Sequence, residues 1–215
     1  MSMFSMPSTQ SARRTTTSYA ILGLLSVRSW TTYELAKQVT RSLNWFWPRA
    51  ERKIYDEPKR LVADGLATAT KGHTGLRPRT VYSITEDGRR ALGRWLDEPS
   101  APRTVEFEAM LKLFYADAGS MEQLTAVLVG IEREAAQRLA DLRAMTERAL
   151  DGETEFPQRL HLNALGTRLY LEQETTVLRW ARWAQAQVAS WRSTTDPGPW
   201  DARAALDGRT ELPPT

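Results

Sequence analysis

Basic side chains are concentrated in WFWPRAERKIYDEPKRLVADGL (residues 45–66), a segment that otherwise has the apolar spacing of an amphipathic helix. Three- and four-residue spacing directs one face of this helix toward a core, and that face carries Ile54, Pro58, Leu61 and Val62. The opposite face carries Arg49, Arg52, Lys53, Asp56 and Arg60. Guanidinium groups can read guanine edges in a major groove, and ammonium groups can neutralise phosphates. The segment therefore predicts a DNA-recognition helix, with a merely solvated helix face as the alternative.

We expect the leading DNA contacts in the first turns of this helix, at Arg49, Arg52 and Lys53. Arg60 lies late in the helix, where phosphate or solvent is the nearer partner. Pro58 removes a mid-helix hydrogen bond, at a cost of about 3 kcal/mol in an exposed helix. Two interpretations follow: a kink aims the first half of the helix at DNA, or one helix ends before Pro58 and another begins there.

A second basic cluster lies in KGHTGLRPR (residues 71–79), between the β-prone runs LATAT and TVYSI. This pattern predicts a hairpin with a basic loop that carries Lys71, His73, Arg77 and Arg79. Such a wing suits the minor groove or its phosphates, where positive side chains meet a narrow negative channel. His73 is a surface residue of the wing in this interpretation, because nothing nearby supplies further metal ligands.

The elements around these clusters have the order of a winged helix-turn-helix. SYAILGLLSV (residues 18–27) predicts a buried first helix, and Thr31 with Glu34 forms a capping box at the start of a second. The third helix begins near Pro48 and should stop at Gly65. After the hairpin, Thr85 caps a further helix, EDGRRALGRWLDE.

Beyond Pro102 the sequence predicts helices alone. A short helix ends at Gly119 and presents one face formed by Phe107, Met110, Leu111 and Phe114. A capping box at Ser120 and Gln123 starts a long helix with the stripe Leu124, Leu128, Ile131, Ala135, Leu139 and Leu142. The last helix, from about Gln158 to Trp191, carries Leu162, Leu165, Leu169, Val177, Trp180, Ala184, Val188 and Trp191. We expect these stripes to pair with the same helices of a second chain, with an intramolecular bundle as the alternative.

The expected fold class is therefore mainly α with a small β-hairpin: an N-terminal winged helix-turn-helix followed by a C-terminal α-helical dimerisation domain. The expected parts are a flexible arm (1–15), the DNA-binding domain (16–98), the helical dimerisation domain (99–192) and a flexible tail (193–215).

Charge is divided unevenly between these parts. The stretch from Arg13 to Arg94 carries 16 Lys and Arg against 7 Asp and Glu, whereas the rest carries 13 against 19. A basic N-terminal half indicates a nucleic-acid partner, and an acidic, helical remainder indicates a protein-contact module. A basic surface that is merely solvated is the alternative.

Composition excludes several classes of protein among the 215 residues. The absence of cysteine excludes disulfides, thiol catalysis and cysteine-bound zinc. No run of eighteen apolar residues and no signal peptide is present, so we expect a cytoplasmic protein without a membrane partner. No Gly-rich phosphate loop, metal-ligand cluster or nucleophile elbow is present either, so we expect no cofactor and no enzymatic activity.

Five stretches follow one another between Tyr19 and Asp117: YAILGLLS, TTYELAKQV, FWPRAERKIYDEPKRLVADGLA, RTVYSITEDGRRALGRWLDEP and FEAMLKLFYAD. In this order they resemble the motifs of the PadR-like transcriptional regulators. The resemblance implies a homodimeric, repressor-like protein whose winged helix reads a pseudo-palindromic operator in double-stranded DNA. It also implies Tyr55 as the tyrosine of the recognition helix. One departure is that the family pattern Y-P-x-L-K-R-L reads Y-D-E-P-K-R-L here, which places Pro58 where a core leucine is common.

The resemblance further implies a small aromatic inducer, held by aromatic side chains near the dimer interface. Trp95, Trp180, Trp183 and Trp191 could serve, but an aromatic stripe is more often core, so no ligand site is assigned. Thr32 and Tyr33, within TTYELAKQV, complete the expected DNA contacts. A winged-helix adaptor that binds protein and never DNA is the alternative function, although an adaptor would not need the basic groove-facing set.

Overall fold

The computed structural model describes residues 14–42, 54–74, 77–104 and 106–207. The chain divides into two compact units, the first ending at Arg103 and the second beginning at Thr104. This boundary lies a few residues beyond the one expected from the sequence, after the loop that follows the last helix of the first unit. The expected flexible arm lies mostly outside the described residues, and Thr15 at its end caps the first helix.

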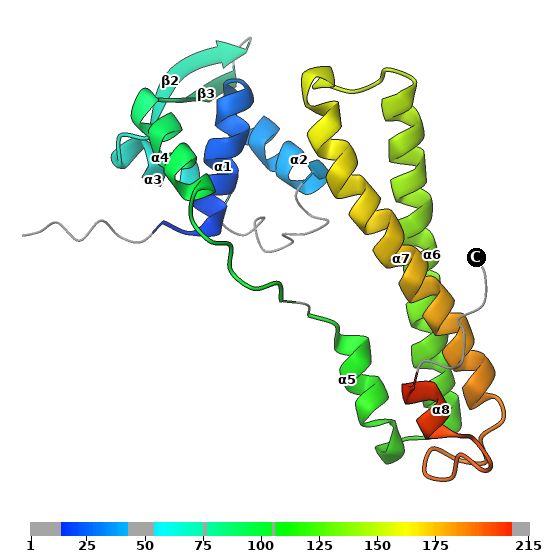
Figure 1. The fold of residues 1–215 in the computed structure, drawn as a ribbon. Coiled ribbons are helices and arrows are strands. Elements are labelled where there is room, and N and C mark those ends of the chain that lie inside the picture. Colours follow the sequence, from blue (N-terminus) through cyan, green and yellow to red (C-terminus); the bar gives the residue numbers. More distant parts are fainter. Residues whose placement is uncertain (1–13, 43–53, 75–76, 105, 208–215) are drawn as a thin grey trace, which may run out of the picture. The chain divides into compact units, whose positions relative to one another are not determined.

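The first unit is a winged helix-turn-helix (Figure 1). Its elements are α1 (Thr16–Val27), β1 (Trp30–Thr31), α2 (Thr32–Ser42), α3 (Glu57–Ala63), β2 (Ala67–Thr74), β3 (Arg77–Ile84) and α4 (Glu86–Leu96). The three strands form an antiparallel sheet in the order β1-β3-β2. The hairpin was predicted, whereas β1 was not, because its two residues become a strand only by pairing Trp30 with Tyr82 of β3.

Local side-chain caps define where the predicted helices begin. The Thr15 hydroxyl accepts from the Ser18 N–H, so α1 starts two residues earlier than the sequence suggested. The Thr85 hydroxyl likewise accepts a 3.0 Å hydrogen bond from the Gly88 N–H at the start of α4. Gly88 also lies against the Leu66 carbonyl, where a Cβ would approach the oxygen to 2.1 Å. Glycine is therefore required where α4 crosses the start of the hairpin.

The core of the first unit joins the helices to the inner side of the sheet. Its buried apolar side chains are Ile21, Leu22, Leu25, Trp30, Leu35, Val39, Ile54, Leu61, Leu66, Ala67, Tyr82 and Ala91. The Tyr19 ring of α1 stacks on the Trp95 ring of α4 with centroids 4.8 Å apart, which extends this packing toward the surface. Most of the apolar side chains expected in the core of the third helix, including Ile54 and Leu61, are buried as predicted.

The position of Pro58 differs from the prediction of one helix running from Pro48 to Gly65. Residues 54–56 form a turn, α3 begins at Glu57, and Pro58 is its second residue. The N–H groups of a first helical turn need no intrahelical acceptor, so proline fits there at little cost. A helix thus begins at Glu57, directly before Pro58, which favours the interpretation of two helices over that of a kink. Residues 43–53, where a preceding helix would end, lie outside the described residues.

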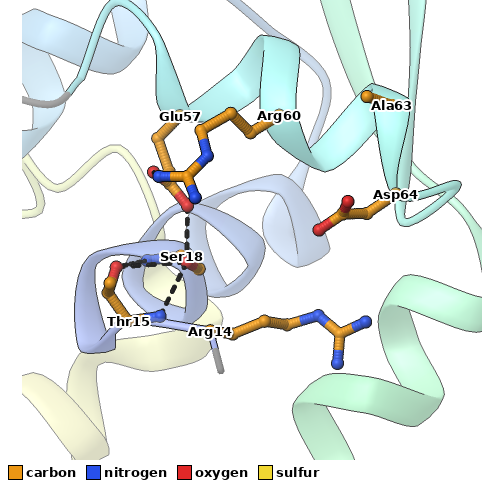
Figure 2. Close-up of a pocket in the computed structure, with 7 residues that line it drawn as sticks. All are labelled: Arg14, Thr15, Ser18, Glu57, Arg60, Ala63 and Asp64. Carbon is orange, nitrogen blue, oxygen red and sulfur yellow. Dashed lines mark hydrogen bonds and ion pairs between the residues drawn. The ribbon is translucent and has the colours of Figure 1, made fainter. Parts of the chain in front are cut away.

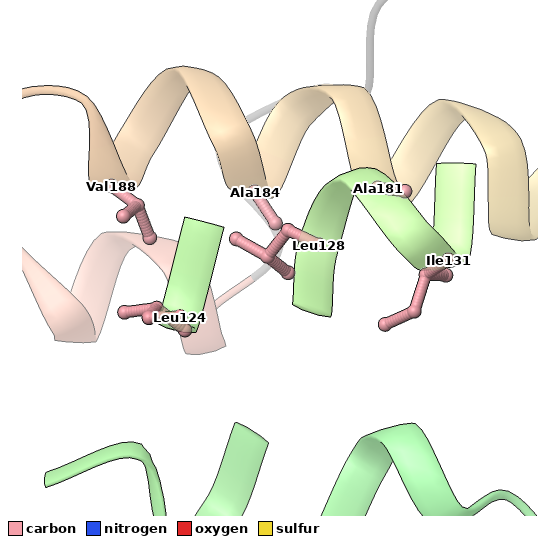
Figure 3. Close-up of a cluster of buried hydrophobic side chains, with 6 residues drawn as sticks. All are labelled: Leu124, Leu128, Ile131, Ala181, Ala184 and Val188. Atoms are coloured by element: carbon pink, nitrogen blue, oxygen red, sulfur yellow. The ribbon is translucent and has the colours of Figure 1, made fainter. Parts of the chain in front are cut away.

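The second unit is built on two long antiparallel helices (Figure 1). Its elements are α5 (Glu108–Phe114), η2 (Ala116–Ala118), α6 (Met121–Leu150), η3 (Pro157–Arg159), α7 (Leu160–Val188) and α8 (Ala202–Leu206). Figure 3 shows a core cluster where α6 and α7 meet, formed by Leu124, Leu128, Ile131, Ala181, Ala184 and Val188. Every member of the stripe predicted for α6 is buried. The apolar face of α6 is thus largely covered by other helices of the same chain. This is the packing expected from the alternative of an intramolecular bundle.

The other two predicted stripes are only partly buried. On α7 the C-terminal half packs against α6, whereas Leu162, Leu165 and Leu169 are exposed. On α5, Phe107 and Leu113 pack on the α6–α7 core, while Leu111 and Phe114 are exposed, so the predicted single face of this helix is wrong. A seven-residue helix is too short for its spacing to distinguish these two faces.

The predicted flexible tail is structured as far as Asp207. The Arg192 and Ser193 N–H groups donate to the Asp196 carbonyl, and the Trp200 indole N–H donates to the Gln187 side chain at 3.0 Å. Asp201 caps α8. Such turns depend on individual side chains rather than on periodic apolar residues, which is why the sequence pattern missed them. Among the described residues, no helix combines the length and apolarity needed to cross a bilayer.

Candidate nucleic-acid interface

The start of α2 presents an exposed tyrosine on a rigid support. The Thr31 N–H and hydroxyl each donate a 2.7 Å hydrogen bond to the Glu34 carboxylate, and the Glu34 N–H donates back to Thr31. These bonds lower the pKa of the Glu34 carboxyl, and the nearby Arg28 guanidinium lowers it further. Arg28 itself lies 3.5 Å above the Trp30 ring. The predicted capping box is confirmed, and it holds Tyr33 with 74% of its surface exposed.

The start of α3 presents the second exposed tyrosine. Tyr55 is 59% exposed, while Ile54 and Pro58 on either side of it are fully buried. One turn further along, Lys59 and Arg60 extend into solvent and pair with residues of their own helix. Lys59 Nζ lies 3.2 Å from the Asp56 carboxylate, and Arg60 Nη1 lies 3.5 Å from that of Glu57. An aromatic ring just before α3 and two cations within α3 are therefore exposed to solvent.

The hairpin divides its predicted contacts between two faces. Lys71, His73 and Arg79 are all exposed, and the register pairs Lys71 with Thr80, Gly72 with Arg79 and His73 with Pro78. Directly paired residues share a face and successive residues alternate, so Lys71 and His73 lie on one face and Arg79 on the other. Lys71 and His73 therefore lie on β2 and Arg79 lies on β3, rather than in the loop. The two strands extend further toward the tip of the hairpin than predicted.

Four predicted contacts cannot be placed. Arg49, Arg52 and Lys53 lie outside the described residues, and so does the side chain of Arg77, whose backbone begins β3. Thr32 is the first residue of α2 and is partly buried beside Tyr33. The structure thus places Lys71 with His73 on one face of the hairpin, Thr32 and Tyr33 at the start of α2, Tyr55 just before α3 and Arg60 within α3.

Glu57, two residues after Tyr55, was not predicted from the sequence as a functional residue. Glu57 is 4% exposed, at the first position of α3, and its carboxylate accepts a 2.5 Å hydrogen bond from the Ser18 hydroxyl of α1 (Figure 2). A cavity of about 240 Å³ borders this contact, with Arg14, Arg60 and Asp64 in its wall. Glu57 stands three residues after Ile54 and four before Leu61, so helical spacing already placed a carboxylate on the core face. Among the described residues, no group of three or more acidic or histidine side chains could hold a metal ion.

Both units match known protein families. Residues 21–94 match the model of the transcriptional regulator PadR-like family, and residues 107–189 match the model named virulence activator alpha C-term. The chain is 28% identical over 134 residues to the negative transcriptional regulator PadR of Bacillus subtilis, covering 61% of this chain and 74% of the relative.

Solved structures show the same likeness over more of the chain. The crystal structure of B. subtilis PadR in complex with operator DNA is similar with a TM-score of 0.68 and 25% identity, over 80% of this chain and 98% of that one. The structure of the same protein in complex with p-coumaric acid is similar with a TM-score of 0.64 and 25% identity, over the same shares of the two chains.

Proposed function

Because this chain belongs to the PadR-like family of transcriptional regulators, we propose that it is a DNA-binding repressor that reads a pseudo-palindromic operator as a homodimer. The observation that carries this proposal is the exposure of Tyr55 just before α3 and of Arg60 within it, while Ile54 and Pro58 between and beside them are buried. A recognition element needs both properties, because side chains read base edges only when a rigid support holds them in register. The relatives are transcriptional regulators, which favours this function over a protein-binding adaptor.

We assign the contacts by element. The face of α3 would enter the major groove, together with Arg49, Arg52 and Lys53 before it. Thr32 and Tyr33 at the start of α2 would contact the backbone beside the groove. The hairpin would follow the minor groove or its phosphates with one of its two faces, which carry Lys71 with His73 and Arg79 respectively, and Arg77 remains an expected contact. The basic character of the first unit supports this assignment, since phosphate neutralisation supplies much of the affinity for DNA.

The second unit would hold the two copies together. Leu162, Leu165 and Leu169 leave an apolar surface on the N-terminal half of α7, which α6 does not cover. Exposed apolar patches on soluble proteins mark interaction sites. A second copy of this chain is the occupant we propose, because a palindromic operator is matched by a two-fold symmetric dimer.

We further propose that a small aromatic molecule releases this repressor, which would act in the cytoplasm through DNA binding rather than catalysis. Support for the inducer comes from B. subtilis PadR, which is described in complex with p-coumaric acid. The tryptophans of this chain do not single out its site. Trp95 is stacked on Tyr19, and Trp180 and Trp183 pack on the α6–α7 core.

A gel shift with the DNA upstream of the protein's own gene tests the proposal, since regulators of this kind are often encoded beside their targets. We expect the chain to bind this duplex and retard its migration. A scrambled duplex of equal length and composition should bind at least about a thousandfold more weakly. Sedimentation of the complex should give two chains per operator. Equal affinity for the two duplexes would exclude sequence-specific recognition, and one chain per duplex would exclude the dimeric reader.

A further inference from the structure

A carboxylate is buried where α1 meets α3 in the first unit. Glu57 is 4% exposed although it begins α3, and its neighbours in the core are the apolar side chains of Ile54, Pro58 and Leu61. Burial of a charged group is unfavourable unless hydrogen bonds and opposite charges compensate it. An apolar side chain at this position would cover the same core without that cost, so the carboxylate requires an explanation other than stability.

The partners of Glu57 lie on two different helices. The Ser18 hydroxyl of α1 donates to one carboxylate oxygen at 2.5 Å, and Arg60 Nη1 lies 3.5 Å from the other (Figure 2). Ser18 is itself held in place, because its hydroxyl accepts a 3.1 Å hydrogen bond from the Thr15 N–H in the capping box of α1. A chain of polar contacts therefore runs from the capped end of α1 through the Ser18–Glu57 hydrogen bond to the ion pair of Glu57 with the exposed guanidinium of Arg60.

These contacts are directional, whereas the apolar contacts beside them are not. Buried Ile54, Pro58 and Leu61 hold α3 against the core, but apolar packing alone tolerates small rotations of a seven-residue helix. A hydrogen bond loses strength steeply when its angle or length changes, so the Ser18–Glu57 contact restricts both the rotation and the position of the first turn. The same restriction orients Arg60, which pairs with Glu57, and the exposed Tyr55, which lies two residues before Glu57.

We propose that Glu57 is a positioning residue for operator recognition. Its hydrogen bond from Ser18 fixes the rotation of α3, and its ion pair directs the Arg60 guanidinium. Tyr55 and Arg60 then approach the DNA in one fixed orientation. Its contribution is to the preference for operator over other sequences rather than to the stability of the fold. This inference rests on the proposed function, because it concerns the accuracy with which the chain reads DNA.

The experiment compares full-length Glu57→Leu, Glu57→Gln and Ser18→Ala with the wild type, and uses Asp64→Asn as a matched control. Asp64 lines the same cavity, so its variant removes a negative charge there without changing the Ser18–Glu57 contact. Each protein is titrated with the upstream duplex of its own gene and with a scrambled duplex, and its thermal unfolding is recorded.

We expect Glu57→Leu to unfold at or above the wild-type temperature, because leucine removes a buried charge and keeps the apolar packing. Its ratio of operator to scrambled affinity should nevertheless fall by about tenfold, comparable to one mismatched base pair. Ser18→Ala should lower the ratio similarly, whereas Glu57→Gln, which keeps an acceptor for Ser18, should stay within about threefold of the wild type. Asp64→Asn should change both affinities alike and leave the ratio unaltered.

The outcomes separate this inference from the proposed function. If the wild type prefers its upstream duplex but Glu57→Leu and Ser18→Ala keep the full ratio, the positioning role is wrong while the function stands. A Glu57→Leu variant that melts lower and keeps the ratio would show that Glu57 is structural. A wild type without any preference between the two duplexes would overturn both proposals.

Discussion

Arg138 on α6 donates a 2.7 Å hydrogen bond from Nε to the Glu174 carboxylate on α7, at a place where Glu174 is almost fully buried. The pair lies beside the apolar cluster of Ala135, Leu139 and Leu178. A second contact of the same kind joins Arg182 of α7 to Glu132 of α6 at 2.8 Å. Two such contacts spaced along the antiparallel pair allow one register between the helices, because a shift by one turn would bury a carboxylate without its partner.

Removal of Arg138 alone should therefore destabilise the second unit. Arg138→Leu leaves the buried Glu174 carboxylate without this donor, and we expect a loss of about 2 kcal/mol in the free energy of unfolding. The double variant Arg138→Leu plus Glu174→Leu should recover most of that loss, because two apolar side chains can pack where the ions were. Urea unfolding of both variants measures the difference. Equal losses in the single and double variants would contradict the role of the pair.

The capping box of α2 predicts a dependence of stability on acid. Hydrogen bonds from Thr31 hold the pKa of the Glu34 carboxyl below its ordinary value of 4.5. A lowered pKa in the folded state stabilises the protein above the ordinary value, and this stability is lost as the pH falls through the lowered one. The wild type should thus exceed Glu34→Gln in unfolding free energy at pH 7, and the two should converge as the pH falls below 4.5 and through the lowered pKa. A constant difference from pH 7 to pH 3 would show that the charge of Glu34 is not involved.

Two exposed tyrosines should contribute differently to DNA binding. Tyr55 lies in the face proposed to enter the major groove, so Tyr55→Ala should lower operator affinity by about 1 to 3 kcal/mol with little change for a scrambled duplex. Tyr33 lies at the start of α2, the helix proposed to contact the DNA backbone, so Tyr33→Ala should weaken both complexes alike. Each variant serves as the control for the other. Titration with the two duplexes checks the assignment, and the opposite pattern would reverse the roles of α2 and α3.

The two faces of the hairpin allow a test of the wing. One face of a two-stranded hairpin can lie against a groove, so either Lys71 with His73 or Arg79 should contact phosphates. Loss of a phosphate contact reduces the slope of log K against log salt by about 0.9 for each contact. If the Lys71 face contacts DNA, Lys71→Ala should reduce this slope and Arg79→Ala should change it little. If the Arg79 face contacts DNA, the two variants should exchange these effects. Equal reductions would mean that the hairpin is surrounded by DNA, and unchanged slopes in both would exclude the wing from the interface.

The exposed leucines of α7 should hold the dimer together. Leu165 is 74% exposed in the single chain, and Leu165→Glu would bury a charge if a second copy covers it. Leu206→Glu on α8 is the matched control, because Leu206 is equally apolar and exposed and lies on another helix. Sedimentation should show a monomeric Leu165→Glu protein with unchanged helix content and a dimeric Leu206→Glu protein. A dimeric Leu165→Glu protein would place the interface elsewhere.

Much of the fold was predictable because it depends on interactions between neighbours in the sequence. The capping boxes of Thr31 with Glu34 and of Ser120 with Gln123 form within four residues, and the structure confirms both. The stripe of α6 was predicted completely, since thirty residues give a helical period many repeats. The resemblance implied Tyr55 as the tyrosine of the recognition helix; the structure shows it exposed, and its contact with DNA stays a prediction.

Only the tertiary structure decided the features that depend on residues far apart in the chain. β1 exists because Trp30 meets Tyr82, and Glu57 is buried where the hydroxyl of Ser18, 39 residues earlier, donates to its carboxylate. Apolar periodicity on α7 likewise could not say which leucines α6 would cover and which would stay exposed. Local sequence specifies which side chains share a face of a helix, but the partner of that face depends on the packing of all the elements together, because burial is a property of the assembled surface.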